Sequence, residues 1–263
     1  TWLSSKELSP ATVVLQIFLS HSRTVARFSA VRTLASLANS HPAIVSPCNM
    51  DLEGLITDPN RSISTCAITT LLNTGTESSV DRLLKQIASY MSDLSDEFRV
   101  TVVTAVKRLA SKYPSKVQVL MNFLSNCLRD EGGLAYKTAV VDVIVKLIQE
   151  FPAARESGLL HLCEFIEDCE HVTLSVTILH LLAVEGPSTS APSRFIRHIY
   201  NRVVLETAPV RAAAVSALAK FALGLPTLRP RIVMLLKRCL SDEEDEVRDR
   251  AIFYLSSLAV EPE

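Results

Sequence analysis

The feature that most constrains the fold of this chain is a short pattern that occurs twice toward its C-terminal end. The stretches Val210–Leu218 and Val247–Leu255 both read Val-Arg-x-x-Ala-apolar-x-x-Leu. Small and apolar residues at i, i+4, i+5 and i+8 share one face of an α-helix. The alanine lets a second helix approach closely, and the arginine stands just inside the helix start, where its head can reach a neighbouring layer. The pattern therefore predicts helices that stack on one another.

The same pattern recurs along the chain with a period near 37 residues when its alanine position is used as a ruler. The ruler residues are Ala30, Ala67, Val102, Ala139, Ser175, Ala214 and Ala251. Arginine stands three residues before the ruler at Arg27, Arg99, Arg211 and Arg248. The pattern departs there at Ser64, at Tyr136 and around Thr173. A fixed period of this length indicates a repeat protein, in which each unit buries its apolar face against the next.

A second apolar helix is expected before each helix that contains a ruler residue. Several of these first helices are followed by an aspartate in a polar turn. Asp58, Asp130 and Asp242 are examples. The unit is therefore helix, tight turn, helix. Seven pairs are expected: Pro10–Ser20 with Thr24–Asn39, Asp51–Thr57 with Asn60–Asn73, Ser78–Met91 with Asp96–Lys112, Ser115–Leu128 with Leu134–Glu150, Glu156–Asp168 with Val172–Ala183, Ser193–Glu206 with Pro209–Leu223, and Arg229–Leu240 with Glu244–Val260.

The predicted fold is all-α, an α-solenoid of about seven HEAT/armadillo-like helix pairs in a right-handed superhelix. Prolines such as Pro10, Pro42 and Pro187 are expected between helices, which they start or stop. The longest break, Glu185–Pro192, reads as a flexible loop and not as a domain boundary, because the repeat continues across it. We expect residues 1–263 to form one solenoid segment. Neither terminus shows a polar end-cap, so we also expect the segment to come from a longer solenoid.

Several functions are disfavoured by composition. The formal net charge of −1 argues against a broad nucleic-acid footprint, and the 7 glycines form no phosphate-binding loop. The apolar run Val172–Val184 is too short to span a bilayer, and the first residues do not resemble a signal peptide. No Gly-x-Ser-x-Gly motif occurs, and the histidines share no spacing, so we expect no catalysis.

The stretch His161–His171 contains two cysteines and two histidines and invites a zinc site. Cys163 and Cys169 lie six residues apart, about 240° around a helix axis, whereas structural zinc uses closely spaced cysteine pairs. We therefore expect no metal and no cofactor. The remaining cysteines, scattered without a pattern, are expected to be free thiols: Cys48, Cys66, Cys127 and Cys239.

The acidic run Asp242–Glu246 lies near a group of basic residues. Negative charge suits the start of the last helix, and Ser241 with Glu244 resembles a capping box. The basic residues nearby are expected to form a solvated face, and the alternative is that they meet acidic lipid or protein: Lys220, Arg229, Arg231, Lys237 and Arg238.

Longer stretches resemble the gamma subunit of coatomer, the large subunit of the coat protein I vesicle coat. They are Asp51–Leu72, His161–Glu170, Ile199–Glu206, Val210–Phe221 and Glu246–Leu255, and the resemblance extends over essentially the whole chain. It is weakest in loops such as Gly186–Pro192. The resemblance implies the second half of the trunk domain of that subunit, a solenoid related to the adaptin large subunits of clathrin adaptors.

The resemblance also implies a function. The trunk embraces the zeta subunit and belongs to a core with the beta and delta subunits. An Arf-family GTPase in its GTP form recruits the coat to Golgi membranes for Golgi-to-ER and intra-Golgi transport. The expected protein is thus a non-enzymatic scaffold, cytoplasmic and peripheral on Golgi membranes and vesicles, with no nucleic-acid partner. Asn60 and Arg61, in the best-matched polar turn, are candidate partner contacts; alternatively they satisfy turn and inter-repeat hydrogen bonds.

The alternative is another HEAT/armadillo scaffold, such as a clathrin-adaptor large chain, a phosphatase scaffold or a nuclear transport receptor. A transport receptor would bind a nuclear-type GTPase and would have no affinity for a small longin-like subunit.

Overall fold

The structure is a computed structural model that describes residues 5–259. Its helices are α1 (Ser5–Leu19), α2 (Thr24–Ser40), α3 (Pro42–Val45), α4 (Asn49–Gly54), α5 (Arg61–Thr74), α6 (Val80–Met91), α7 (Asp96–Lys112), α8 (Val117–Arg129), α9 (Leu134–Glu150), α10 (Pro152–Phe165), α11 (Val172–Glu185), α12 (Ser193–Leu205), α13 (Ala208–Gly224), α14 (Arg229–Arg238) and α15 (Asp245–Ala259). Short 3-10 turns cover Ser46–Cys48, Glu77–Ser79, Pro114–Lys116, Gly186–Ser188 and Cys239–Ser241. No strand occurs within residues 5–259.

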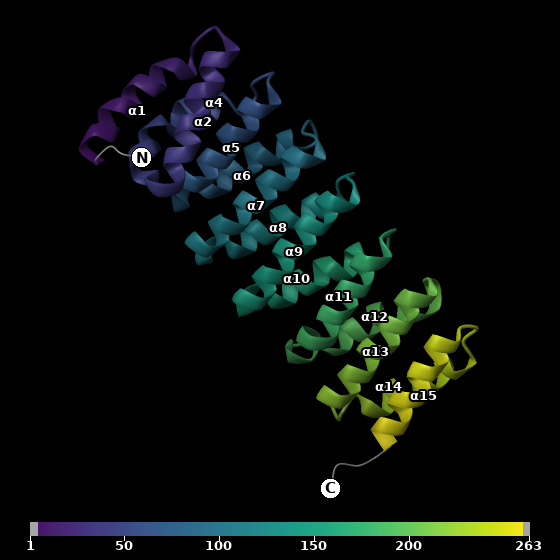
Figure 1. Cartoon of the computed structure of the whole chain (residues 1–263). Coiled ribbons are helices and arrows are strands. Elements are labelled where there is room, and N and C mark those ends of the chain that lie inside the picture. The colour runs from purple at the N-terminus through teal and green to yellow at the C-terminus, as the bar shows by residue number, and fades with distance from the viewer. Residues whose placement is uncertain (1–4, 260–263) are drawn as a thin grey trace. The chain divides into compact units, whose positions relative to one another are not determined.

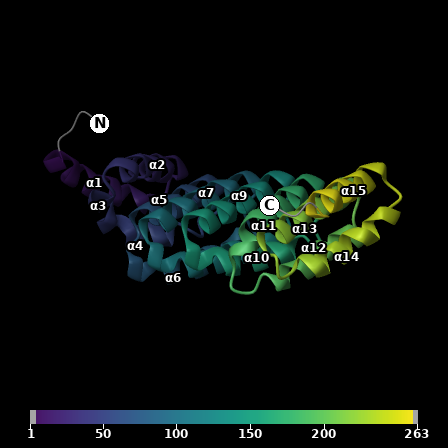
Figure 2. The same ribbon diagram turned by 90° about the horizontal axis from the view of Figure 1, so that it is seen from below.

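The chain divides into two compact units, Thr1–Val143 and Ile144–Glu263. In the first unit α2, α5 and α7 lie side by side in one row, and α4, α6 and α8 belong to the other row (Figure 2). In the second unit α11, α13 and α15 form one row, while α10 and α12 contact each other in the other (Figure 1). Apart from the additional short helix α3 (Pro42–Val45), successive helices alternate between the two rows of their unit, which is the arrangement that a helix–turn–helix repeat predicts. The expectation of one continuous segment stays a prediction.

The ruler positions explain why these helices pack. Ala30, Ala67, Val102 and Ala214 are 2% exposed or less, and Ser175 is also buried. A small residue at each of these points allows the backbones of paired helices to approach closely. Ala139 is only half-buried, and Val140 beside it is fully buried instead. In the last helix Ala251 is buried, whereas Ile252 is 53% exposed. The predicted register is therefore correct, with small shifts in α9 and α15.

Pro10 lies inside α1 and not between helices, so the expected helix start at Pro10 is wrong by five residues. A proline within a helix removes one backbone hydrogen bond. Here the helix continues through it, because Leu8 and Leu19 on either side are both buried and α1 packs on α2.

Other boundaries also differ from the expectation. The helix expected over Glu156–Asp168 is α10, Pro152–Phe165, because a proline is tolerated in the first turn of a helix, where its missing N–H is not needed. The helix expected over Asp51–Thr57 is α4, Asn49–Gly54, and it follows a broken segment that contains Pro42 and Pro47. The last helix begins at Asp245, and its expected end, Val260, lies outside the described residues.

The segment Glu185–Pro192, expected to be a flexible loop, is anchored at its start. Gly186 is buried, and a Cβ atom on it would collide with the ring of Phe221 in α13. Glu185, the last residue of α11, pairs with Arg155 of α10 at 3.0 Å. The glycine is therefore required by close packing between this turn and α13.

We predict that Gly186→Ala destabilises the chain by about 1–3 kcal/mol, because the added methyl group must displace the buried ring of Phe221. Urea unfolding followed by circular dichroism measures this. Gly224→Ala is the matched control, since a Cβ there meets only Pro187, with its Cβ at 3.4 Å and its Cγ at 3.6 Å, which is ordinary van der Waals contact. Equal stability of the two variants would contradict the packing argument.

Candidate functional site

The arginine of the repeat closes the turn between the two helices of its own pair. The Nη1 group of Arg27 donates to the carbonyls of His21 and Ser22, at 2.9 and 3.1 Å. Arg99 donates in the same way to the carbonyls of Met91 and Ser92. The last carbonyls of a helix have no partner within that helix. A guanidinium that binds them satisfies those groups and places positive charge at the negative end of the helix dipole.

Arg248 repeats this arrangement in the second unit. Its Nη1 group donates to the carbonyls of Asp242 and Glu243, at 2.6 and 2.9 Å. In the preceding pair the Nη1 group of Arg211 donates to the carbonyl of Glu206, at 2.9 Å. All four arginines of the repeat pattern therefore donate hydrogen bonds to backbone carbonyls at the turn of their own helix pair.

Two of these arginines also bind the aspartate of the next pair, 31 residues further along. Arg27 Nε lies 3.0 Å from Asp58 Oδ2. Arg211 donates through Nε and Nη2 to the two oxygens of Asp242, at 3.1 and 2.9 Å. Each aspartate also accepts a backbone N–H two residues later, from Asn60 and from Glu244. One carboxylate thus shapes its own turn and joins two layers.

Where the repeat lacks this arginine, another side chain takes its place. In the fourth pair Lys137 is 7% exposed, and its Nζ donates to the carbonyls of Cys127, Leu128 and Asp130. Burial lowers the pKa of Lys137, against the opposing charge of Asp130. In the fifth pair the donor is Arg202, from α12 of the following pair, at 3.0 Å from the carbonyl of Ile166 and 3.2 Å from that of Glu167.

The second pair uses a tyrosine, and this explains the positions of Asn60 and Arg61. The Tyr90 hydroxyl donates to the carbonyl of Asp58 at 3.3 Å, and Arg61 hydrogen-bonds to that hydroxyl with its guanidinium 5.1 Å from the ring centroid. The Asn60 side chain caps α5 by accepting from the backbone of Ser62 and Ile63. Both residues therefore have structural partners, and their contact with another protein stays a prediction.

The cysteine-and-histidine stretch is divided between two elements. His161 and Cys163 lie in α10, whereas Cys169 and His171 lie in the turn before α11. Within residues 5–259 no group of three or more metal-ligating side chains comes together. Burial raises the pKa of Cys163 to about 12, which keeps its thiol protonated.

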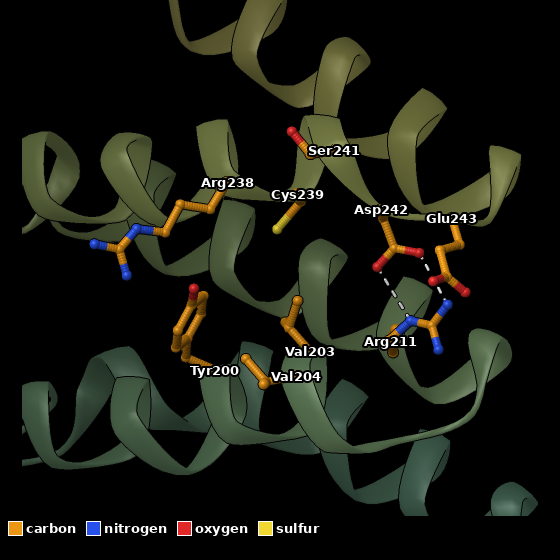
Figure 3. A pocket seen from close by; sticks show the side chains of 9 residues that line it. All are labelled: Tyr200, Val203, Val204, Arg211, Arg238, Cys239, Ser241, Asp242 and Glu243. Atoms are coloured by element: carbon orange, nitrogen blue, oxygen red, sulfur yellow. Dashed lines mark hydrogen bonds and ion pairs between the residues drawn. The ribbon is translucent and has the colours of Figure 1, made fainter.

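A hollow of about 390 Å³ opens between α12 and the end of α14 (Figure 3). Tyr200 and Arg238 lie at one end, and the Arg211–Asp242 pair lies with Glu243 at the other. Arg238 is exposed and makes no hydrogen bond or ion pair within residues 5–259. The Cys239 thiol donates to the carbonyl of Leu235, and burial raises its pKa to about 11. The lining can pair charges and contact apolar groups, but it offers no ionised thiol as a nucleophile.

None of the helices within residues 5–259 has both the length and the apolar character needed to cross a bilayer.

A protein-family model described as "Adaptin N terminal region" matches residues 3–261. This chain belongs to the adaptin N-terminal region family. Coatomer subunit gamma of Arabidopsis thaliana is 61% identical over 256 residues, and coatomer subunit gamma-2 of Homo sapiens is 59% identical over 255 residues. Each alignment covers 97% of this chain, and the chain spans 29% of the length of each relative. The predicted resemblance to the gamma subunit of coatomer is confirmed.

Solved structures show the same fold for this adaptin-family chain. One is a homology model of the full-length AP-3 complex in an intermediate open conformation. The alignment covers 97% of this chain and 53% of the matched AP-3 chain, with a TM-score of 0.69 at 11% sequence identity. Another is Kap121p bound to RanGTP. The alignment covers 97% of this chain and 29% of the Kap121p chain, with a TM-score of 0.67 at 15% sequence identity. The prediction of an all-α, HEAT-type solenoid is confirmed.

The hydrogen bonds from side chains to the carbonyls of the turns, called the turn network below, could in part have been predicted from the sequence of this adaptin-family chain. The repeat pattern located the four arginines, and the spacing from Arg27 to Asp58 and from Arg211 to Asp242 is the same 31 residues. Nothing in the pattern indicates Lys137 or Arg202, since they lie outside the repeated position. The hollow in Figure 3 was not predicted either, because among its lining residues only Val204 and Ser241 stand at equivalent positions of their repeats.

The Arg211–Asp242 pair predicts a pH dependence of stability. Burial raises the pKa of the Asp242 carboxyl, but hydrogen bonds from Arg211 and the Glu244 N–H, with the charges of Arg211 and Arg248, outweigh this effect and hold the pKa below its ordinary 3.8. A depressed pKa in the folded state stabilises the fold above pH 3.8, and this stabilisation is lost as the pH falls through the folded-state value.

Urea unfolding of the wild type and of Asp242→Asn from neutral pH to about pH 3 tests this. The variant should be about 1–3 kcal/mol less stable at neutral pH, and the difference should shrink in acid. Glu243→Gln is the control, because Glu243 is exposed and its side chain makes no ion pair within residues 5–259. A stability difference that stays constant with pH would contradict the assignment.

Proposed function

We propose that this chain is a scaffold segment of a coatomer-type vesicle coat, within a subunit of the gamma kind. The observation that carries the proposal is the identity of 59–61% with coatomer gamma subunits over 97% of the chain. Identity at this level extends across surfaces as well as the core, and interaction surfaces are what a scaffold needs to retain. The proposed role is to bind other coat subunits, without a chemical reaction of its own.

The proposed partners follow from the resemblance. They are the coatomer zeta subunit, the beta and delta subunits, and an Arf-family GTPase in its GTP form. In this proposal the GTPase senses the nucleotide and brings the coat to Golgi membranes, so the chain is cytoplasmic and peripheral on Golgi membranes and vesicles. The cargo pathway is Golgi-to-ER and intra-Golgi transport. The helix pairs serve as layers that present their exposed faces to these partners.

The turn network supports a scaffolding role in physical terms. Arg99 binds the carbonyls of Met91 and Ser92 in its own turn and the carbonyl of Glu131 in the turn of the next pair, and such bonds hold neighbouring helices in fixed positions. A surface whose layers are held in this way loses little conformational freedom when a partner binds, which favours affinity.

Arg61 is our proposed contact residue, together with Asn60 beside it. Arg61 is half-buried, and the face of Tyr90 and its hydroxyl hold the guanidinium in place. A positioned arginine can donate two parallel hydrogen bonds to a carboxylate of a partner. Asn60 is exposed, but its side-chain oxygen already caps α5, so it offers a partner mainly its amide N–H group.

A nuclear transport receptor is the alternative that the shared fold raises. The likeness to Kap121p is at 15% identity, which supports only the fold. A coat scaffold and a transport receptor are therefore best distinguished by which partner protein the chain binds.

The experiment is a co-expression pull-down of this chain with the coatomer zeta subunit, with a clathrin-adaptor small chain as the control. We expect a stoichiometric complex with zeta and none with the adaptor small chain. Capture of the adaptor small chain instead of zeta would contradict the proposal that the chain belongs to a coatomer-type coat. If neither protein is captured, a longer trunk that includes the preceding half should be tested, and failure of that trunk to bind zeta would overturn the proposal.

Variants of the same complex test the proposed contact. Arg61→Ala should weaken capture of the coat partners about tenfold, because an interfacial arginine hydrogen bond is lost. Arg32→Ala is the matched control, since it removes an exposed arginine of α2, away from the turn between α4 and α5. Asn60→Asp keeps the cap on α5, whereas Asn60→Ala should cost about 1 kcal/mol of stability. Equal capture by Arg61→Ala and wild type would remove Arg61 from the interface.

A further inference from the structure

A polar groove crosses the row of α2, α5 and α7 in the first unit, far along the chain from the hollow in Figure 3. These three helices lie side by side (Figure 2). Two hollows of about 320 and 480 Å³ lie on this row, and they share Asn39, Asn73 and Arg108 as lining residues. One residue of each helix thus contributes to both, so the two hollows are parts of one continuous groove.

The two asparagines retain free hydrogen-bonding capacity. Asn73 Nδ2 donates to Asn39 Oδ1 at 3.3 Å. The amide N–H₂ of Asn39 and the amide oxygen of Asn73 make no further hydrogen bond within residues 5–259. A donor and an acceptor that stand next to each other match the N–H and C=O groups of an extended peptide, which has no internal partners for them.

The charge in the groove has one sign. Arg108 is exposed, and within residues 5–259 it makes no hydrogen bond or ion pair. Lys112 donates to the carbonyls of Asn73 and Gly75, at 3.1 and 3.2 Å, which fixes its charge at the same end of the groove. No aspartate or glutamate lines either hollow. The nearest acid along α7 is Glu97, eleven residues before Arg108 and so about 16 Å away along the helix axis.

We propose that this groove binds an extended, acidic peptide segment, with its backbone on Asn39 and Asn73 and a carboxylate on Arg108. A helical ligand fits less well, because its backbone groups are already paired and it would need an apolar groove. A single-stranded nucleic acid also fits less well, since no aromatic side chain lines the groove for base stacking. Two helix spacings of about 8–10 Å correspond to about five or six extended residues.

This site is separate from the proposed coat function. It would accept an unfolded acidic segment of a partner protein, and its test uses a short peptide and no coat subunit. Failure of either proposal therefore leaves the other standing.

The test is fluorescence anisotropy of the full chain with a labelled hexapeptide of alternating glutamate and serine. A hexapeptide of alternating lysine and serine and a six-nucleotide single-stranded oligouridylate are the comparison ligands. We expect saturable binding of the glutamate peptide that weakens with salt. The lysine peptide should not bind. Absence of saturable binding of the glutamate peptide, or tighter binding of the oligouridylate, would overturn the proposal.

Variants locate the site. Arg108→Ala should weaken binding of the glutamate peptide about five- to tenfold, and Arg108→Lys should have a smaller effect because it keeps the charge but loses the bidentate geometry. Asn73→Ala should weaken binding and leave the salt dependence unchanged. Lys85→Ala is the matched control, since it removes one positive charge from an exposed position on α6, in the other row of the same unit. Equal weakening by Lys85→Ala and Arg108→Ala would show a general charge effect and reject the groove.

Discussion

The fold depends on how the backbone carbonyls at the end of each first helix, and in the turn after it, are satisfied. A tight turn between two packed helices leaves these carbonyls partly buried and without partners in their own helix. An unsatisfied buried carbonyl costs about 1–3 kcal/mol, so a chain with many such turns must supply donors. This chain supplies a charged donor or a tyrosine hydroxyl in every pair: Arg27, Tyr90, Arg99, Lys137, Arg202, Arg211 and Arg248.

The choice of donor also links neighbouring layers. Arg27 and Arg211 continue to an aspartate of the next pair, and Arg202 reaches back to the pair before it. Close packing at the small ruler residues brings the helices together, and the turn donors then fix the angle between them. The adaptin-family fold of this chain therefore needs two repeated patterns: apolar residues that pack the helices, and polar donors that bind the turn carbonyls. The pattern of polar donors is the less regular of the two.

That difference explains how much could be predicted from the sequence. Apolar packing follows helical periodicity, so the pairs and most helix ends were predictable. A long cation can reach a carbonyl from several positions, so Lys137 and Arg202 carry no fixed spacing. Pro10 within α1 was missed because burial on both sides outweighed a lost hydrogen bond. Gly186 was read as flexible because the ring of Phe221 that restricts it lies 35 residues further along.

The candidate sites divide in the same way. Asn60 and Arg61 were found through a resemblance, and the structure adds their partners in the turn. In the groove on α2, α5 and α7, Asn73 and Arg108 each stand six residues after a ruler residue, whereas Asn39 stands nine residues after Ala30, so only part of the groove follows the repeat. In the hollow beside Tyr200 and Arg238 only Val204 and Ser241 share a repeat position, ten residues before Ala214 and Ala251, so the period is weak there.

The most direct test of the central claim uses the fifth pair, where the donor comes from another repeat. Arg202→Met should lower the free energy of unfolding in urea by about 2–3 kcal/mol, because the carbonyls of Ile166 and Glu167 lose a charged donor. Arg197→Met, at an exposed position of the same helix, should have little effect. Val172 stands at the repeat position that carries arginine elsewhere, so adding Val172→Arg to Arg202→Met should recover the part of the stability that comes from the carbonyls, while the pair of Arg202 with Glu206 stays lost. A double variant no more stable than Arg202→Met, or an Arg202→Met as mild as Arg197→Met, would contradict the account.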